Sequence, residues 1–201
     1  MTTFRRPREG RAGVENDDTM VDGSDSTFVI WFTGISGAGK STIAAIVEER
    51  LRERRLSVHN LDGDELRHGL NRDLGFSDAD RAENIRRVGE LVRLFNNVGM
   101  IVLVAAISPF REGRDAARGL AGPGRFVEVH VDTPLEVAEE RDVKGLYRRA
   151  RSGQLANFTG IDSPYEAPLH PEVRIDSTFP TPEDAADEVF RVLVTMGLLA
   201  N

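Results

Sequence analysis

Short strand-like segments alternate with amphipathic stretches along most of the chain. The first, Phe28–Phe32, is entirely apolar, as is typical of a strand buried on both faces of a parallel sheet. Further strands are predicted at 57–61, 100–107, 126–131 and 173–175. Helices are predicted between and after them, at 41–55, 78–97, 112–119, 134–140, 144–152 and 182–196. This alternation predicts an α/β fold with a mainly parallel central sheet.

The ends of the pattern indicate how the chain is organised. Residues 1–26 are polar, mix both charges with glycine and show no periodicity, so we expect a disordered tail followed by one domain over 27–201. The segment 153–171 is rich in glycine and proline and is predicted to be a functional loop.

Composition narrows the class of protein. Apolar residues make up 40% and charged residues 29%, and the net charge of -7 argues against a general nucleic-acid binder. The absence of cysteine excludes disulfides, thiolate metal sites and thiol catalysis. No apolar run is long enough to span a membrane, and no secretory signal is evident, so we expect a cytoplasmic protein. Only two lysines occur among the 26 basic residues, Lys40 and Lys144.

Lys40 belongs to a phosphate-binding pattern, G-x-x-x-x-G-K-[ST], which begins at Gly34 directly after the first strand and opens a helix. Glycines let the backbone wrap phosphates, and the helix N-terminus offers free N–H groups. Lys40 is predicted to reach the β- and γ-phosphates, and Ser41 to bind Mg²⁺. The nucleotide-binding residues predicted here are Gly34, Ile35, Ser36, Gly37, Ala38, Gly39, Lys40, Ser41 and Thr42.

The loop alone leaves several uses of the nucleotide open. Neither lysine follows an asparagine, so the guanine signature Asn-Lys-x-Asp is absent, and the domain is small for a mechanical ATPase. A kinase for a small acceptor remains by elimination. The second strand ends at Asp62, with Asp64 close by, and carboxylates at such a strand end suit metal binding and orientation of an acceptor hydroxyl.

Basic and polar residues follow these carboxylates. Arg81 and Asn84 are three residues apart on one helix face, where they are placed to hold an anion or a base, and Arg67 is placed to clamp an anion. For any single arginine here a surface ion pair is the competing interpretation.

Longer segments carry a family resemblance. The stretches 61–76, 80–87, 107–111, 142–147 and 157–165 are similar to those of adenylylsulfate kinases, and the similarity runs from about Phe28 to near the C-terminus. The resemblance implies a P-loop NTPase-like three-layer sandwich. It implies ATP-dependent phosphorylation of adenosine 5′-phosphosulfate (APS) to 3′-phosphoadenosine 5′-phosphosulfate (PAPS) for sulfate assimilation, with Mg²⁺ as cofactor. A second hypothesis is a kinase for another acceptor, such as gluconate, shikimate or a nucleoside monophosphate. A third is a nucleotide-binding regulatory domain that has lost its activity.

The resemblance also implies roles for particular residues. Asp62 assists Mg²⁺ together with Ser41, and Asp64 positions the acceptor. The reverse assignment of these two carboxylates stays open. A lid at about 141–165 closes over both nucleotides. Phe76 and Phe158 offer faces to the acceptor adenine, with core packing as the alternative, and Phe158 is judged the less natural core residue. The remaining acceptor contacts and lid residues are Ile107, Ser108, Pro109, Asn157, Lys144 and, over the ATP adenine, Arg141.

Ser108 has two interpretations. By resemblance it occupies a position described in the family as a phosphoserine intermediate, whereas direct in-line transfer needs no covalent step, and contact with APS is the preferred role. The predicted catalytic set is Lys40, Asp62, Asp64, Ser108 and Lys144. The resemblance further implies a homodimer and leaves open an association with ATP sulfurylase.

Overall fold

The computed structural model describes residues 27–176 and 179–200 of the 201-residue chain, so the tail predicted to be disordered, 1–26, lies outside the described residues. Within them one five-stranded sheet has the order β2-β3-β1-β4-β5, and every neighbouring pair is parallel. The strands are β1 (Val29–Thr33), β2 (Val58–Asp62), β3 (Ile101–Ala105), β4 (Phe126–Val131) and β5 (Val173–Ile175). The predicted α/β fold with a parallel sheet is confirmed.

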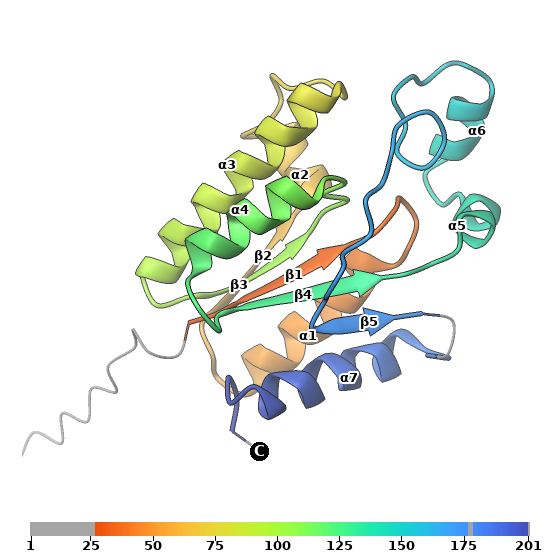
Figure 1. Ribbon diagram of the computed structural model, residues 1–201. Helices are drawn as coiled ribbons and strands as arrows, with labels where there is room; N and C mark the ends of the chain where they lie inside the picture. Colours follow the sequence, from red (N-terminus) through yellow and green to blue (C-terminus); the bar gives the residue numbers. More distant parts are fainter. Residues whose placement is uncertain (1–26, 177–178, 201) are drawn as a thin grey trace, which may run out of the picture.

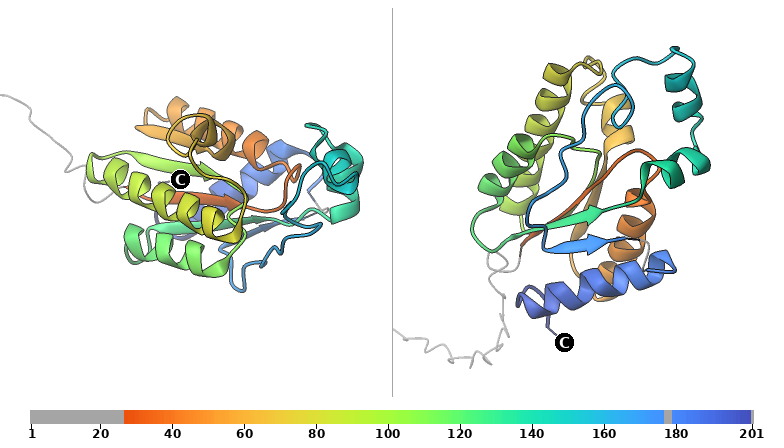
Figure 2. Two further views of the ribbon diagram at one scale, coloured as in Figure 1. Left: turned by 90° about the horizontal axis from the view of Figure 1, so that it is seen from above. Right: turned by 45° about the vertical axis from the view of Figure 1, so that its right-hand side comes forward.

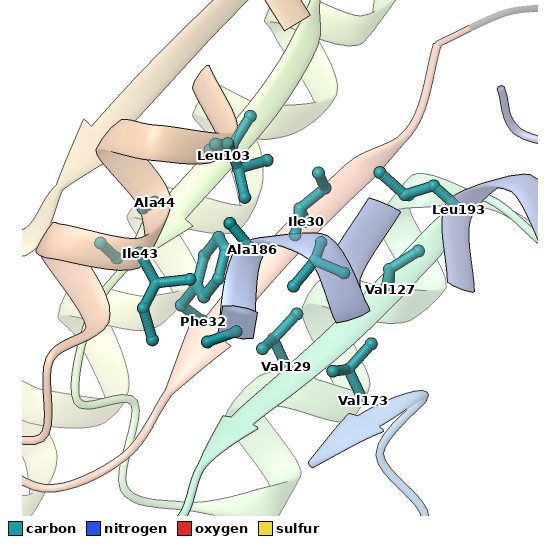
Figure 3. Packing of buried hydrophobic residues seen from close by; sticks show 14 of the residues in the cluster. Ile30, Phe32, Ile43, Ala44, Leu103, Val127, Val129, Val173, Ala186 and Leu193 are labelled. Atoms are coloured by element: carbon teal, nitrogen blue, oxygen red, sulfur yellow. The ribbon is translucent and has the colours of Figure 1, made fainter. Parts of the chain in front are cut away.

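Helices cover both faces of the sheet, which gives three layers (Figure 1). Helices α1 (Lys40–Glu53) and α7 (Pro182–Thr195) pack on one face, and α3 (Asp78–Asn97) and α4 (Arg111–Ala121) on the other, as Figure 2 shows from two further sides. Figure 3 shows the first core, where Phe32 and Val129 of the sheet meet Ile43 of α1 and Ala186 of α7. Trp31 belongs to the second core, on the opposite face.

Local signals fix where the helices begin. The Ser77 and Asp80 side chains form a capping box at the start of α3, and Thr181 caps α7 with proline in its first turn. One short helix, α2 (Gly63–His68), was not predicted: the Asp62 side chain accepts a hydrogen bond from the Asp64 backbone and so caps it.

The predicted lid extends beyond the carboxyl ends of the central strands (Figure 1). It contains α6 (Leu146–Arg151) and follows α5 (Leu135–Arg141), whose last residue is the first of the lid. A small core joins the lid to α5 and to Ile35 of the phosphate loop, and in it the Tyr147 and Phe158 rings meet edge to face. The predicted helix over 144–152 begins two residues late, because Gly145 adopts a left-handed φ of 66°. Lys144 therefore precedes the helix instead of lying on it.

Strand order positions the site. β1 lies between β3 and β4, and chain segments that leave the carboxyl ends of these strands therefore surround one crevice. Among the residues described, none of the helices is both long and apolar enough to span a lipid bilayer.

Candidate active site

The loop between β1 and α1 passes very close to the end of β4. Gly34 has a φ of 151°, and a Cβ atom built there would lie 2.5 Å from the Val131 carbonyl oxygen, so this position requires glycine. Helix α1 starts at Lys40 without a side-chain cap, since its N-cap residue is Gly39. The free N–H groups at this end are therefore available to an anion.

Lys40 is held against its own loop. Its side chain is buried, with 8% of the residue exposed, and Nζ donates hydrogen bonds to the carbonyl oxygens of Gly34 (3.0 Å) and Ile35 (2.8 Å). Burial lowers the pKa of Lys40 to about 8, a shift that the nearby Asp64 carboxylate partly opposes. An anion bound in the loop would restore the stability of the ammonium form.

Ser41 and Asp62 form a set of oxygen ligands. Ser41 Oγ donates to Asp62 Oδ2 over 2.7 Å, and Asp62 Oδ1 accepts from the Asp64 N–H over 2.8 Å. A hydroxyl and a carboxylate are ligands that suit Mg²⁺. In the described part of the chain no group of three or more His, Cys, Asp or Glu could hold a metal, so a cation here would depend largely on phosphate oxygens and water.

Lys144 of the lid forms an ion pair with Asp64 across the crevice. Both side chains are more than half exposed, at 57% and 60%. The turn that presents Lys144 is fixed by Asp142, whose carboxylate accepts from the backbone N–H groups of Tyr147 (2.9 Å) and Arg148 (3.1 Å). The two predicted catalytic groups from distant segments thus meet.

The Phe76 ring lies within cation–π distance of two guanidinium groups. The Cζ atoms of Arg67 and Arg81 are 4.6 Å and 5.6 Å from its ring centroid, and the residue is 46% exposed. Arg81 also donates to the carbonyl oxygens of Phe76 (3.1 Å) and Asn157. Burial lowers the pKa of both arginines, yet guanidinium stays protonated at any physiological pH. The wall combines an exposed aromatic face with two fixed positive charges.

Asn84 is fixed by a residue that sequence reasoning gave no role. The fully buried Asn71 donates from Nδ2 to Asn84 Oδ1 over 3.0 Å. A polar residue at a fully buried position is the signal that marks Asn71, and burial cannot be assigned from the sequence alone.

Ser108 is turned into the protein. It is 1% exposed with a φ of 41°, and its Oγ accepts a hydrogen bond from Trp31 Nε1 (3.0 Å) and donates to the Ala106 carbonyl oxygen (3.3 Å). Both hydrogen-bonding functions of the hydroxyl are engaged within the protein.

Phe158 is more buried than its place in a glycine-containing loop suggested. It is 6% exposed and packs against Tyr147, with ring centroids 4.9 Å apart. The expectation that packing would be the less natural role for Phe158 was therefore wrong, because Phe158 belongs to a small core with Tyr147 and Ala138. Part of the residue still lines the cavity described next.

One cavity of about 1260 Å³ collects nearly all the predicted site residues. Gly34 and Ile35 do not line it, but their carbonyl oxygens accept hydrogen bonds from the Lys40 ammonium. Arg141 lines it from the last residue of α5. The predicted residues that line it are Ser36, Gly37, Ala38, Gly39, Lys40, Ser41, Thr42, Asp62, Asp64, Arg67, Phe76, Arg81, Asn84, Ile107, Ser108, Pro109, Arg141, Lys144, Asn157 and Phe158.

The sheet order, the phosphate loop and the Asp62 carboxylate beside Ser41 together define a nucleotide-binding protein of the P-loop class. A sequence model of the family described as Adenylylsulphate kinase matches residues 26–176. The chain belongs to the adenylylsulphate kinase family.

Individual relatives agree with this assignment. The chain is 53% identical to the adenylyl-sulfate kinase of Geotalea daltonii, with 90% of each chain covered. It is 60% identical to that of Klebsiella pneumoniae, with 74% of each covered. It is similar to the structure of the Mycobacterium tuberculosis APS kinase CysC in complex with AMPPNP and APS, with a TM-score of 0.80, 49% identity, and coverage of 84% of this chain and 98% of that one.

Proposed function

We propose that this protein transfers the γ-phosphoryl group of ATP to the 3′-hydroxyl of adenosine 5′-phosphosulfate, which gives ADP and PAPS. One observation carries the proposal: a phosphate loop and the wall formed by Phe76, Arg67 and Arg81 line the same cavity, with Asp64 and Lys144 paired across it. At about 1260 Å³ the cavity exceeds the usual range of roughly 300–1000 Å³ for a single small ligand, which suits two nucleotides.

ATP would bind along the loop side. The N–H groups at the start of α1 receive the phosphates, and the Lys40 ammonium exchanges its two carbonyl partners for β- and γ-phosphate oxygens. Arg141 and Phe179 both line the cavity, and we assign them to the ATP adenine.

Ser41 and Asp62 are the residues that would hold Mg²⁺, since both supply oxygen atoms and already lie 2.7 Å apart. When bound, the ion supplies positive charge to the β- and γ-phosphates during transfer. Asp62 is engaged with Ser41 and Asp64 with Lys144, so we assign the metal side to Asp62 and the acceptor side to Asp64.

APS would bind along the opposite wall. Its adenine stacks on the exposed face of Phe76, and the cavity edge of Phe158 contributes from the lid. Arg67 and Arg81 meet the negative charge of the phosphosulfate group, and Asn84 supplies a fixed polar contact.

Transfer then follows from positioning and charge. Asp64 accepts a hydrogen bond from the 3′-hydroxyl, orients it towards the γ-phosphorus and takes its proton as the new O–P bond forms and the bond to ADP breaks. Lys144, released from Asp64, places its ammonium against the charge that develops on the transferring group. Ile107, Ser108 and Pro109 border the acceptor, and no covalent phosphoserine is required.

The experiment is an assay of ADP release by the full chain with Mg-ATP, run with and without APS. We expect release to depend on APS, the product to carry phosphate at the 3′ position by ³¹P NMR, and activity to disappear with EDTA and return with Mg²⁺. Gluconate, shikimate and AMP serve as competing acceptors. A rate that is the same with and without APS, or higher with one of these acceptors, rejects the proposal.

Assembly forms part of the same proposal. We expect one domain over 27–201 that associates as a homodimer, and light scattering on an eluting size-exclusion peak measures this directly. Association with ATP sulfurylase is tested by the same measurement on a mixture of the two proteins, where a peak heavier than either component is the expected sign.

A further inference from the structure

A charged pair is buried beside the acceptor wall, outside the residues given a role above. Arg114 of α4 is 2% exposed and Glu128 of β4 is 6% exposed, and Arg114 Nε donates to Glu128 Oε1 over 2.6 Å. Neither residue lines the cavity. Taking two charges out of water costs more than apolar packing would, so stability alone does not account for the pair.

The other nitrogens of the same guanidinium hold two separate backbone segments. Nη1 donates to the Ser108 carbonyl oxygen over 2.6 Å, and Nη2 donates to the Glu166 carbonyl oxygen over 2.7 Å. Ser108 lines the cavity where the acceptor is proposed to bind, and we call Ser108–Pro109 the acceptor wall. Glu166 directly follows the predicted lid, 141–165. One planar fork of fixed geometry therefore sets the position of the wall and of the lid end together.

Further hydrogen bonds join the same two segments. The Glu166 N–H donates to the Pro109 carbonyl oxygen (2.8 Å), and Glu166 Oε2 accepts from the Arg111 N–H (2.8 Å). Ser108 has a left-handed φ of 41°, which L side chains disfavour. Because a backbone residue keeps such a conformation only when its surroundings impose it, the contact from Arg114 acts on a strained point of the wall.

We propose that Arg114 is a positioning residue for the acceptor: it fixes the Ser108–Pro109 wall and anchors the C-terminal end of the lid to it, with Glu128 holding the guanidinium in orientation. The inference rests on the proposed function and adds to it. The end of the lid and the Ser108–Pro109 segment then keep one relative position. The hydrogen bonds of Arg114 go to Glu128, Ser108 and Glu166, and none of them goes to the phosphate loop.

The kinetic test compares Arg114→Lys with Arg118→Met. Lysine keeps the positive charge but, as a point donor, cannot reproduce three hydrogen bonds in the directions of a planar fork. Arg118 lies on the same helix and pairs with Glu172 and Glu128, but no hydrogen bond joins it to Ser108 or Glu166. For Arg114→Lys we expect kcat/KM for APS to fall about 10- to 100-fold while KM for ATP stays within about twofold. For Arg118→Met we expect both to stay within about twofold.

Hydrogen exchange on the ligand-free full chain gives a readout that does not depend on activity. In Arg114→Lys, the amides of residues 107, 108, 110, 111 and 165–167 should exchange at least about tenfold faster than in the unmodified chain, with the phosphate loop unchanged. Exchange that rises over the whole chain marks an unfolded variant. Glu128→Gln is then tested instead, by the same kinetic constants and the same localised exchange.

The outcomes separate the two proposals. If the unmodified chain shows no APS-dependent ADP release, the proposed function is rejected. Localised faster exchange in Arg114→Lys would still support the anchoring role of Arg114. Two results would overturn the positioning role. One is wild-type kinetics and exchange in Arg114→Lys, and the other is a KM for ATP that rises as much as the KM for APS.

Discussion

The Lys144 ammonium and the Asp64 carboxylate meet across the cavity, although 80 residues separate them in the chain. Each partner stands at the end of a different structural unit: Asp64 lies in the first turn of α2, and Lys144 lies in the turn before α6. Because both side chains are largely exposed, the pair contributes little to stability, and it is better explained by a function that brings the lid to the carboxylate.

Replacing Lys144 by methionine tests that function. If its ammonium stabilises the transferring phosphoryl group, kcat should fall about 10²- to 10³-fold while KM for ATP changes little. Steady-state kinetics measure both. Arg151→Met is the matched control, since Arg151 forms an exposed pair with Glu139 in the same lid, and its kcat should stay within about twofold. Equal losses in the two variants would show that lid charge in general, and not Lys144, matters.

The lowered pKa of Lys40 predicts a dependence of nucleotide affinity on pH. The folded chain loses this proton near pH 8, whereas the unfolded chain keeps it up to about 10.5. Between these values the unfolded state binds more protons, so the contribution of Lys40 to stability rises with pH. Phosphate favours the ammonium form, so affinity for a non-hydrolysable ATP analogue should weaken above pH 8, by up to about tenfold per pH unit.

Calorimetry between pH 7 and 9.5 measures this affinity, and buffers of different ionisation enthalpy report proton uptake on binding at pH 8.5. Lys40→Arg is the control, because guanidinium keeps its proton throughout this range. An affinity that is independent of pH in the unmodified chain, or that falls with the same slope in Lys40→Arg, would contradict the role of Lys40 as the titrating phosphate ligand.

Phe76 should affect the acceptor alone. If adenine stacks on its exposed ring, Phe76→Ala removes an interaction worth about 1–3 kcal/mol and raises KM for APS roughly fivefold to a hundredfold. KM for ATP should stay unchanged, because the phosphate loop is on the other wall. Leu70→Ala is a control of similar exposure, 51%, at a residue that does not line the cavity, and both constants should stay at their wild-type values. A parallel rise in both KM values for Phe76→Ala would argue against stacking.

The sequence predicted those features that depend on neighbours in the chain. The predicted helix over 78–97 is confirmed as α3. Its apolar period runs along the helix, and the Ser77–Asp80 capping box fixes its first residue. Asp62 and Ser41 were expected at one sheet edge because each follows a parallel strand, and their side chains are hydrogen-bonded there. Helix α2 was missed because six residues are too few to show a period, and its start depends on a side-chain cap.

Features that depend on distant partners were not predictable. In the sequence, Arg114 resembles any other cation on a helix. Its contacts with Glu128 and the Glu166 carbonyl oxygen, which the sequence does not reveal, distinguish it from the partly exposed Arg118 on the same helix. Phe158 was likewise misjudged because the ring that buries it, Tyr147, lies on another segment of the lid. The roles of Arg114 and Phe158 depend on tertiary contacts, and the periodicity of hydrophobic residues along the chain carries no information about such contacts.

Ser108 provides a test of whether the reaction has a covalent step. Its hydroxyl is occupied by Trp31 Nε1 and the Ala106 carbonyl oxygen, so Ser108→Ala should lose both hydrogen bonds and leave the Trp31 N–H unpaired. We expect a loss of roughly 1–3 kcal/mol in stability, with kcat kept within about tenfold. Ser108→Gly also lacks the hydroxyl but accepts the φ of 41° without strain, so it should be the more stable of the two, by about 1 kcal/mol in denaturant unfolding. If activity follows stability across the pair, Ser108 acts through its backbone. A loss above about 10³-fold in both variants, together with ³²P that becomes attached to Ser108 and chases into PAPS at the turnover rate, would establish a phosphoserine intermediate instead.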